Sequence, residues 1–391
     1  MKFVLAPDSF KESMTAKNAA LEMEKGIKKV FPHAECVIVP MADGGEGTVE
    51  SLVSFSNGEI HNTKVIGPLG KEVIAEYGLL DEGKTAVIEM ASASGLGLIK
   101  LEDRNPLLTT TYGTGQLIKH ALDKGVSRFL IGIGGSATND GGMGMLQALG
   151  VSFKNQNGDE LPFGGGALDQ LHSIDISGLD ERIKTVKIDV ACDVTNPLIG
   201  ENGCSAIFGP QKGATPEMVK LLDQNLAHFG EVIKMQLQLD ITQIEGSGAA
   251  GGLGAGLMAF LNARLKKGIE LVIEYTGLEE KIIGADFCFT GEGSIDGQTL
   301  FGKTPYGVAA IAKKHSVPVI AFAGRIGKGV DVLHHHGFNA IIGILKGVTS
   351  LEEALESGHD NLAFASENIC RVLKIQRQHT ALKPAAVCAR S

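Results

Sequence analysis

Short apolar runs alternate with amphipathic helical stretches at both ends of the chain, and this rhythm most limits the possible fold. Near the N-terminus the runs KFVLA (2–6) and ECVIVP (35–40) are typical of buried strands. The stretch between them has apolar residues at three- and four-residue steps: Ala19, Met23, Ile27 and Val30. This spacing predicts one apolar face of an α-helix, capped by Ser13 or Thr15.

The last hundred residues repeat the same rhythm. Apolar runs that predict strands are ADFCFTG (285–291), VPVIAFAG (317–324) and NAIIGIL (339–345). Helical stretches lie at 307–315 and within 351–376. Short buried strands alternating with helices indicate a parallel sheet covered on both faces, so we expect the two ends of the chain to share one sheet.

The middle of the chain has a different pattern. Strand-like runs between 63 and 90 are separated by GPLGK and DEGK, which are typical of hairpin turns. A strand-like run near 128–135, a helical stretch at 139–149 and another strand-like run near 186–193 follow. The predicted fold is α/β, with a parallel, Rossmann-like or flavodoxin-like domain (1–62 and 284–391) and an inserted mixed α/β domain (63–283). We expect disorder after about Lys383.

Composition excludes several classes of protein. The 391 residues are 43% hydrophobic and 21% charged, which predicts an ordinary soluble globular protein of two domains. A net charge of -9, without a Lys/Arg run or a Trp, makes nucleic acid and membrane surfaces poor partners. The short apolar start is no signal peptide, no apolar run is long enough to span a membrane, and the scattered cysteines suit a reducing compartment, so we expect a cytoplasmic protein.

Polar loops that carry a carboxylate directly follow several predicted strands. The carboxylates are Asp8, Asp43, Asp140, Asp193 and Glu292. Any single loop of this kind can be a turn or a helix cap, because Asp, Asn, Ser and Gly favour both. Together they favour a ligand site, since ligands of open α/β sheets bind outside the carboxyl ends of the strands.

Two short patterns offer competing interpretations. The stretch IGIGGSATNDGG matches the dinucleotide fingerprint, but the following strand lacks the acidic partner and is followed by Lys154 and Asn155. Glycine-lined backbone N–H groups that hold an anion at a helix N-terminus are the plainer interpretation. The stretch EGSGAAGGLGAG (245–256) is a second place where backbone could approach a ligand closely, although Gly and Ala also mark tight helix packing.

The second pattern, GQTLFGKT (297–304), fits the Walker pattern letter for letter. A Walker loop begins at the end of a strand. Here we expect the strand to end near Thr290, with the acidic stretch GEGSID intervening, and we find no second Walker motif downstream. We therefore interpret the match as chance and expect Lys303 to lie near a phosphate in another geometry.

A set of motifs also resembles a known family. In order, APDSFKES, PMADGGEGT, GIGGSATNDGG, CDVTNPL, FGPQKGA, GAAGGLGAG and TGEGSIDGQTLFGKTP resemble the bacterial glycerate kinase family, from Lys2 to about Gly347. The resemblance implies an ATP-dependent kinase that phosphorylates D-glycerate, usually to 2-phosphoglycerate. It also implies two α/β domains with the active site in the cleft. A glycerate 3-kinase stays open as an alternative, as do an NADP-linked hydroxy-acid oxidoreductase and a non-enzymatic hydroxy-acid binder.

Site residues follow from chemistry and loop position. Phosphoryl transfer needs positioning, neutralised phosphate charge and a group that orients or deprotonates the acceptor hydroxyl, and Mg²⁺ takes oxygen ligands. We expect Asp193 to be the base, Asp43 and Glu292 to hold the metal, and Lys11 and Lys212 to meet the carboxylate of glycerate or the phosphates. The predicted substrate- or phosphate-binding residues are Asp8, Ser9, Gly134, Gly135, Ser136, Asn139, Asp140, Asn196 and Lys303. A helix cap or a solvated lysine is the alternative for each; the oligomeric state is not predicted.

Overall fold

The chain divides into two compact units. The computed structural model describes residues 1–45 and 47–381. The first unit comprises Met1–Ala42 and the residues from Ile273 onward, and the second comprises Asp43–Val272. The predicted disorder after Lys383 concerns residues outside those described.

The boundaries between the units, after Ala42 and after Val272, lie earlier along the chain than the predicted boundaries near 62 and 284. The reason is strand pairing: β3 (Glu59–Ile66) is the edge strand of the second unit's sheet, and α2 (Thr48–Ser56) packs against β4 and β5 of that sheet. The residues from 43 to 62 therefore lie with the second unit. The predicted cleft between the units stays a prediction.

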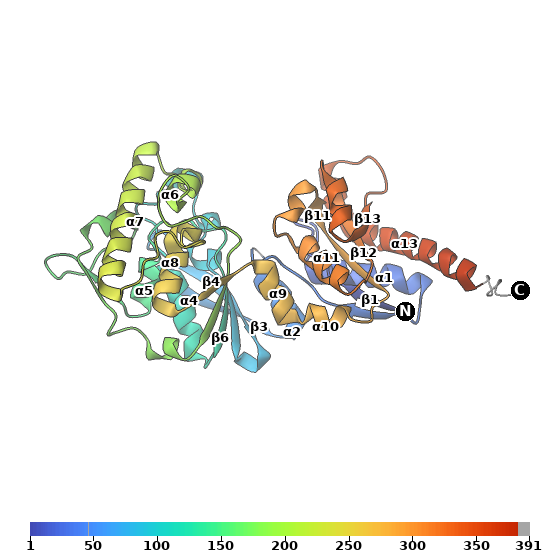
Figure 1. The fold of residues 1–391 in the computed structure, drawn as a ribbon, viewed down its shortest axis with the longest axis horizontal. Coiled ribbons are helices and arrows are strands. Elements are labelled where there is room, and N and C mark those ends of the chain that lie inside the picture. The colour runs from blue at the N-terminus through green and yellow to red at the C-terminus, as the bar shows by residue number, and fades with distance from the viewer. Residues whose placement is uncertain (46, 382–391) are drawn as a thin grey trace, which may run out of the picture. The chain divides into compact units, whose positions relative to one another are not determined.

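The first unit is built on a sheet with the order β13-β12-β11-β1-β2, in which every neighbouring pair is parallel. This confirms that both ends of the chain share one parallel sheet (Figure 1). Its strands are β1 (Lys2–Leu5), β2 (Glu35–Ile38), β11 (Phe287–Ile295), β12 (Val319–Ile326) and β13 (Phe338–Gly343). Its helices are α1 (Ala16–Val30), α10 (Leu278–Ile282), α11 (Thr304–Lys314), α12 (Leu351–Glu356) and α13 (Gly358–Ala381).

Helix α1 forms where the apolar spacing predicts it. Thr15 caps it by accepting a hydrogen bond from Asn18 N, and the predicted apolar face is buried. The helix packs along α13, which continues in red beyond it in Figure 1. Gly26 permits this contact, because a Cβ there would lie 2.4 Å from the carbonyl oxygen of Ala363.

The second unit is built on a mixed sheet with the order β10-β9-β6-β5-β4-β3. The hairpins predicted between 63 and 90 are present as antiparallel pairs β3–β4 and β4–β5, whereas β5, β6, β9 and β10 are parallel. Besides β3, its strands are β4 (Glu72–Leu80), β5 (Thr85–Glu89), β6 (Arg128–Gly132), β9 (Lys187–Ala191) and β10 (Arg264–Lys266). Strands β7 (Ser152–Lys154) and β8 (Ser173–Asp175) form a separate two-stranded antiparallel sheet. Besides α2, its helices are α3 (Ala91–Ser94), α4 (Tyr112–Asp123), α5 (Met143–Ala148), α6 (Cys204–Phe208), α7 (Pro216–Leu237) and α8 (Ala249–Leu261). The boundary between the units after Val272 lies within α9 (Gly268–Thr276).

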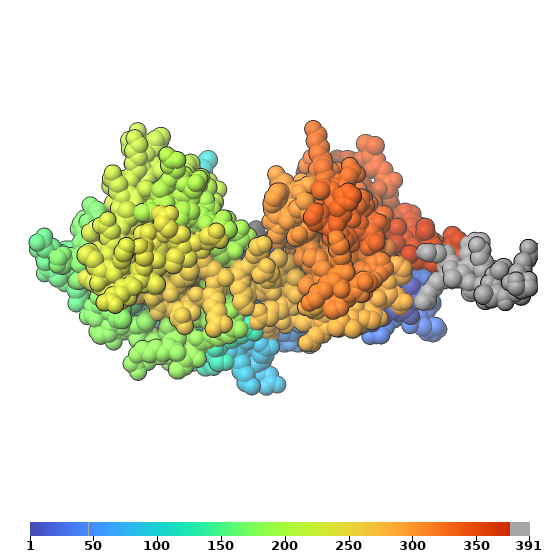
Figure 2. Space-filling view, viewed as in Figure 1, coloured from blue at the N-terminus to red at the C-terminus, as the bar shows by residue number. Residues whose placement is uncertain are grey.

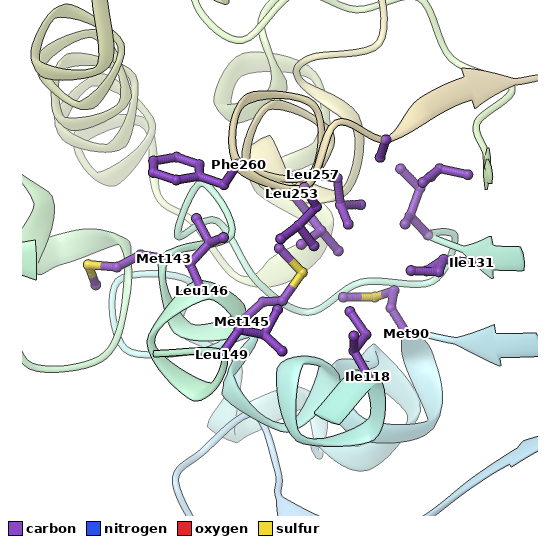
Figure 3. Close-up of a cluster of buried hydrophobic side chains, with 14 of the residues drawn as sticks. Met90, Ile118, Ile131, Met143, Met145, Leu146, Leu149, Leu253, Leu257 and Phe260 are labelled. Atoms are coloured by element: carbon purple, nitrogen blue, oxygen red, sulfur yellow. The ribbon is translucent and has the colours of Figure 1, made fainter. Parts of the chain in front are cut away.

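The core of the second unit lies between these helices and the sheet. Figure 3 shows side chains of α5, α8, α4 and β6 pointing toward one another, among them Met145, Leu253, Ile118 and Ile131. Helix α7 covers part of the outside and forms much of the yellow-green surface in Figure 2. Burying this apolar surface holds the loops at the strand ends in place.

Two further features bear on the predictions. Helix α5 begins at Met143, later than the predicted 139, because the preceding residues form a loop tied down by Asp140. Within the residues that the structure describes, no helix is long and apolar enough to cross a membrane.

Candidate functional site

Two neighbouring strands of the second unit end at the same level of the sheet. Strands β6 and β9 are parallel, with Gly132 opposite Ala191. The polar loops that follow them, at 133–142 and 192–197, therefore leave the sheet side by side. This edge of a parallel sheet is where ligands of open α/β folds bind.

A cavity of about 310 Å³ opens at this edge, and we call it the lysine cavity. It is lined by Asp43, Gly44, Gly45, Ile133–Ser136, Ala191–Val194, Phe208, Gln211, Lys212, Ala249 and Ala250. The structure thus brings together the predicted residues Asp43, Gly134, Gly135, Ser136, Asp193 and Lys212 around one space.

The carboxylates of Asp43 and Asp193 face this cavity together. The side chain of Asp193 reaches solvent through the cavity, but the surrounding protein removes enough water to raise its pKa above the usual value, and the negative charge of Asp43 adds to the rise. The Gly268 N–H donates a hydrogen bond to Asp193 Oδ1 over 3.1 Å, and this bond lowers the pKa of Asp193. An aspartate with a raised pKa is a better proton acceptor than an ordinary one.

Close backbone packing sets the spacing of this pair. A Cβ at Gly268 would lie 1.8 Å from the carbonyl oxygen of Asp43, so glycine is required there. Gly44 has a φ of +87°, which favours glycine, and a Cβ on it would lie 2.5 Å from the Cβ of Ala191. Asp43 is thereby fitted against the strand end that carries Asp193.

Lys212 brings a positive charge to the same cavity. Its side chain is 2% exposed, and Nζ donates to Ser136 Oγ over 2.7 Å and to the carbonyl oxygen of Thr138 over 2.6 Å. Burial lowers its pKa to about 8, whereas Cys204 and Asp140 act in the opposite direction. Both acceptors are neutral oxygens, and the carboxylate of Asp140 that also acts on the ammonium is held by its own hydrogen-bond donors, so Lys212 can still attract an anion.

The loop at 133–136 supplies open backbone. Gly135 has a φ of +73°, a conformation that glycine adopts without strain. A Cβ at Gly134 would meet no atom within 4 Å, so this glycine leaves space that a side chain would fill. Main-chain groups can therefore approach a ligand directly here.

Three predicted residues of the second unit do not line the cavity. Asp140 is fully buried and accepts hydrogen bonds from Thr111 N and Oγ1, both at 2.8 Å, and from Gly142 N and Gly144 N. Asn139 is also fully buried, with Nδ2 donating to Ser205 Oγ. Asn196 donates to the carbonyl oxygen of Asn202. In these contacts the three side chains stabilise the loops, which is the role that was predicted as the alternative to ligand binding.

The first unit carries its own polar set where β1 and β11 lie side by side. Lys303 Nζ donates to Glu292 Oε1 over 3.0 Å, and Thr304 Oγ1 donates to Asp8 Oδ2. Burial raises the pKa of Glu292 to about 7; Lys303 lowers it and the negative charge of Asp8 raises it. Ser9 is tied to this set through its N–H, which donates to Asp8 Oδ1 over 2.6 Å.

Lys11 lies in the turn after β1 and is exposed. Its backbone N lies 3.5 Å from the position of a Cβ at Gly293, next to Glu292 in the sequence. The turn is therefore close to the polar set of the first unit.

The Walker-like stretch has a different context from the one that we predicted. Strand β11 extends to Ile295, so the prediction that it ends near Thr290 is wrong. The acidic stretch continues as strand because it pairs with β12 as far as Ile326. A short 3₁₀ turn, Gly297–Leu300, follows, and α11 begins at Thr304. Lys303 forms an ion pair with Glu292 in this arrangement.

Sequence reasoning missed several residues of the lysine cavity. Cys192, Phe208 and Gln211 line it. They lie in the motifs CDVTNPL and FGPQKGA, but their uncharged side chains were not chosen as site residues. Ala250 also lines it and has a φ of +53°, unusual for a residue other than glycine. Its signal was the glycine-dense stretch 245–256, whose residues Gly251 and Gly252 are left-handed as well.

The donor set suits a hard cation held mainly by its substrate. Within the described residues, no group of three or more His, Cys, Asp or Glu side chains could hold a metal ion. Mg²⁺ in phosphoryl-transfer enzymes needs only one or two carboxylates, with phosphates and water completing its shell. The carboxylate of Asp43, which lines the lysine cavity, fits that requirement.

Comparison with known proteins agrees over nearly the whole chain. Residues 3–374 match the sequence model of the glycerate kinase family. A protein named glycerate 2-kinase from Escherichia coli K12 is 53% identical over 96% of this chain and 98% of its own length. A glycerate kinase from Bacillus subtilis 168 is 51% identical over 96% of this chain and 99% of its own length.

The fold agrees as well. The crystal structure of a candidate glycerate kinase 2 from Salmonella typhimurium LT2 has a TM-score of 0.90 and 48% sequence identity, and the match covers 97% of this chain and 99% of that one. The chain therefore belongs to the glycerate kinase family and is a kinase, a phosphotransferase with an alcohol acceptor.

Proposed function

We propose that this enzyme transfers the γ-phosphoryl group of ATP to the C2 hydroxyl of D-glycerate, with Mg²⁺ bound to the nucleotide. One observation carries the proposal: Asp43, Asp193 and Lys212 surround a single cavity of about 310 Å³. Glycerate is a small anion with hydroxyl groups, so it needs one cation and one proton acceptor in a small space. The name of the Escherichia coli relative supports the choice of C2.

Asp193 is proposed as the group that accepts the proton of the acceptor hydroxyl. Its raised pKa brings it nearer to the working pH, and the Gly268 N–H holds one of its oxygens. Asp43 is proposed to hold Mg²⁺, which would neutralise phosphate charge during transfer. Glu292 keeps its predicted metal role as a proposal from the first unit.

Lys212 is proposed to bind the carboxylate of glycerate or the transferred phosphoryl group. An ammonium that donates two hydrogen bonds to Ser136 and Thr138 has a third proton to offer and a fixed position. Gly134 and Gly135 would leave main-chain groups open to the same anion. We also keep the prediction that the substrate or the phosphates are bound by Asp8, Ser9, Lys11 and Lys303.

The test is ADP release from Mg-ATP with D-glycerate, with L-glycerate and D-lactate as controls. Product is followed with enolase alone and then with added phosphoglycerate mutase. A signal with enolase alone means 2-phosphoglycerate, and a signal only after the mutase is added means a 3-kinase. ADP formation with none of the three acids would overturn the proposal.

A further inference from the structure

A second, larger cavity shares a wall with the lysine cavity. Its volume is about 770 Å³, and we call it the glutamate cavity. It is lined by Gly44, Gly45, Gly47, Val49, Glu50, Asn62, Ile74, Glu76, Glu89, Ala91, Ser92, Leu96–Leu98, Gly132, Gly134 and Gly135. Four of these glycines, 44, 45, 134 and 135, line both cavities. A ligand can therefore extend from one space to the other across a wall that carries no side chains.

Charge determines which end of such a ligand enters which cavity. The glutamate cavity is bordered by Glu50, Glu76 and Glu89, and no Lys or Arg of the described chain lines it. A polyphosphate would be repelled there, whereas the lysine cavity offers the ammonium of Lys212. A ligand with an anionic end and a neutral end must therefore direct its anionic end to the lysine cavity.

Apolar surface in the glutamate cavity suits the neutral end. The side chains of Ile74 and Leu98 are 70% and 42% exposed, although both are large and hydrophobic. Both line the cavity, where a flat aromatic ring could cover them. Asn62 lies opposite Glu76 across the β3–β4 ladder, so an amide and a carboxylate stand beside this surface. Together they offer donors and acceptors for the edge of a base and for sugar hydroxyls.

We propose that the glutamate cavity binds the nucleoside of ATP, while the phosphates cross the glycine wall into the lysine cavity. The inference rests on the proposed function, because it places the phosphate donor of that reaction. It assigns the base and sugar to a cavity of about 770 Å³ and the smaller glycerate to the cavity of about 310 Å³, in keeping with their sizes.

The experiment compares Leu98→Ser and Ile74→Ser with the matched control Leu101→Ser. Leu101 is 74% exposed, lies three residues beyond Leu98 and does not line the cavity. Isothermal titration with Mg-ADP gives the Kd of each variant, and steady-state assays give KM for ATP and for D-glycerate. All three side chains are exposed, so folding should be preserved, and melting temperatures check this.

Loss of one apolar contact with the base should raise the Kd for ADP and the KM for ATP by about tenfold in Leu98→Ser and Ile74→Ser. The KM for D-glycerate should stay within about twofold, and Leu101→Ser should match the wild type on every measure. ADP binding within about twofold of the wild type in both cavity variants would overturn the inference. The wild-type ADP release assay is run first, so a failure of the proposed function is seen separately.

Discussion

The two units place a lysine among carboxylates in opposite ways. In the second unit Lys212 is buried and donates only to neutral oxygens in the contacts that the structure shows. In the first unit Lys303 is 35% exposed and forms an ion pair with Glu292. A buried ammonium that donates only to neutral oxygens is costly to hold, and the charge of Asp140 offsets part of that cost, whereas Lys303 is paired directly with Glu292. The comparison indicates that the second unit is organised around an anionic ligand and the first around an internal pair.

The largest expected effect tests the second unit's base. Asp193→Asn keeps the shape of the side chain but removes its ability to accept a proton. Turnover should fall by about 10²- to 10⁴-fold, the usual contribution of a general base, with an unchanged melting temperature. The control is Asp169→Asn, an exposed aspartate of the same unit, which should keep normal turnover. Near-normal turnover in Asp193→Asn would remove it from the base role.

The next effect compares the two lysines directly. Lys212→Met replaces a buried ammonium by an apolar chain of similar length and should lower kcat/KM for D-glycerate by about 10²-fold, the value of a charged hydrogen bond of about 3 kcal/mol. Lys303→Met should lower it by about tenfold or less, because that lysine is already neutralised by Glu292. A larger loss in Lys303→Met than in Lys212→Met would reverse the comparison.

The pH dependence of binding sharpens the same contrast. The pKa of Lys212 is lowered to about 8, so its positive charge disappears as the pH rises above 8. The KM for D-glycerate should therefore increase above pH 8 in the wild type, whereas an ordinary lysine loses its charge only near pH 10.5. In Lys212→Met the KM should be high at all pH values and lack this step. A wild-type KM that stays flat to pH 10 would contradict the assignment.

The smallest effect concerns the stability of the first unit. The pKa of Glu292 is raised to about 7 in the folded chain from an ordinary value of 4.5. The folded state therefore binds more protons between pH 4.5 and 7, so this group's contribution to stability is present below pH 4.5 and is lost as the pH rises through 7. Glu292→Gln should show a smaller fall in melting temperature between pH 5 and 8 than the wild type does. An identical fall in both proteins would count against the raised pKa.

The local sequence pattern correctly predicted much of the fold. The apolar face of α1 and the parallel strands at both chain ends follow from periodicity, and the cap of α1 is Thr15, one of the two predicted candidates. Both signals act over a few residues. The hairpins of the second unit follow from their turn residues in the same way. The sequence did not predict the end of β11, because the stretch Gly291–Ile295 forms a strand through its pairing with β12. Partners distant in sequence decided that boundary.

The candidate site also depends partly on local sequence and partly on residues that are distant in sequence. The sequence by itself determined which loops carry carboxylates and lysines, and the family motifs pointed to a kinase. Only the tertiary structure decided that Asp43, Asp193 and Lys212 face one cavity, whereas Asp140, in an equally suggestive loop, is buried among backbone donors. The physical reason is that a carboxylate's role depends on which groups surround it. Those groups come from strands and helices that only folding brings together.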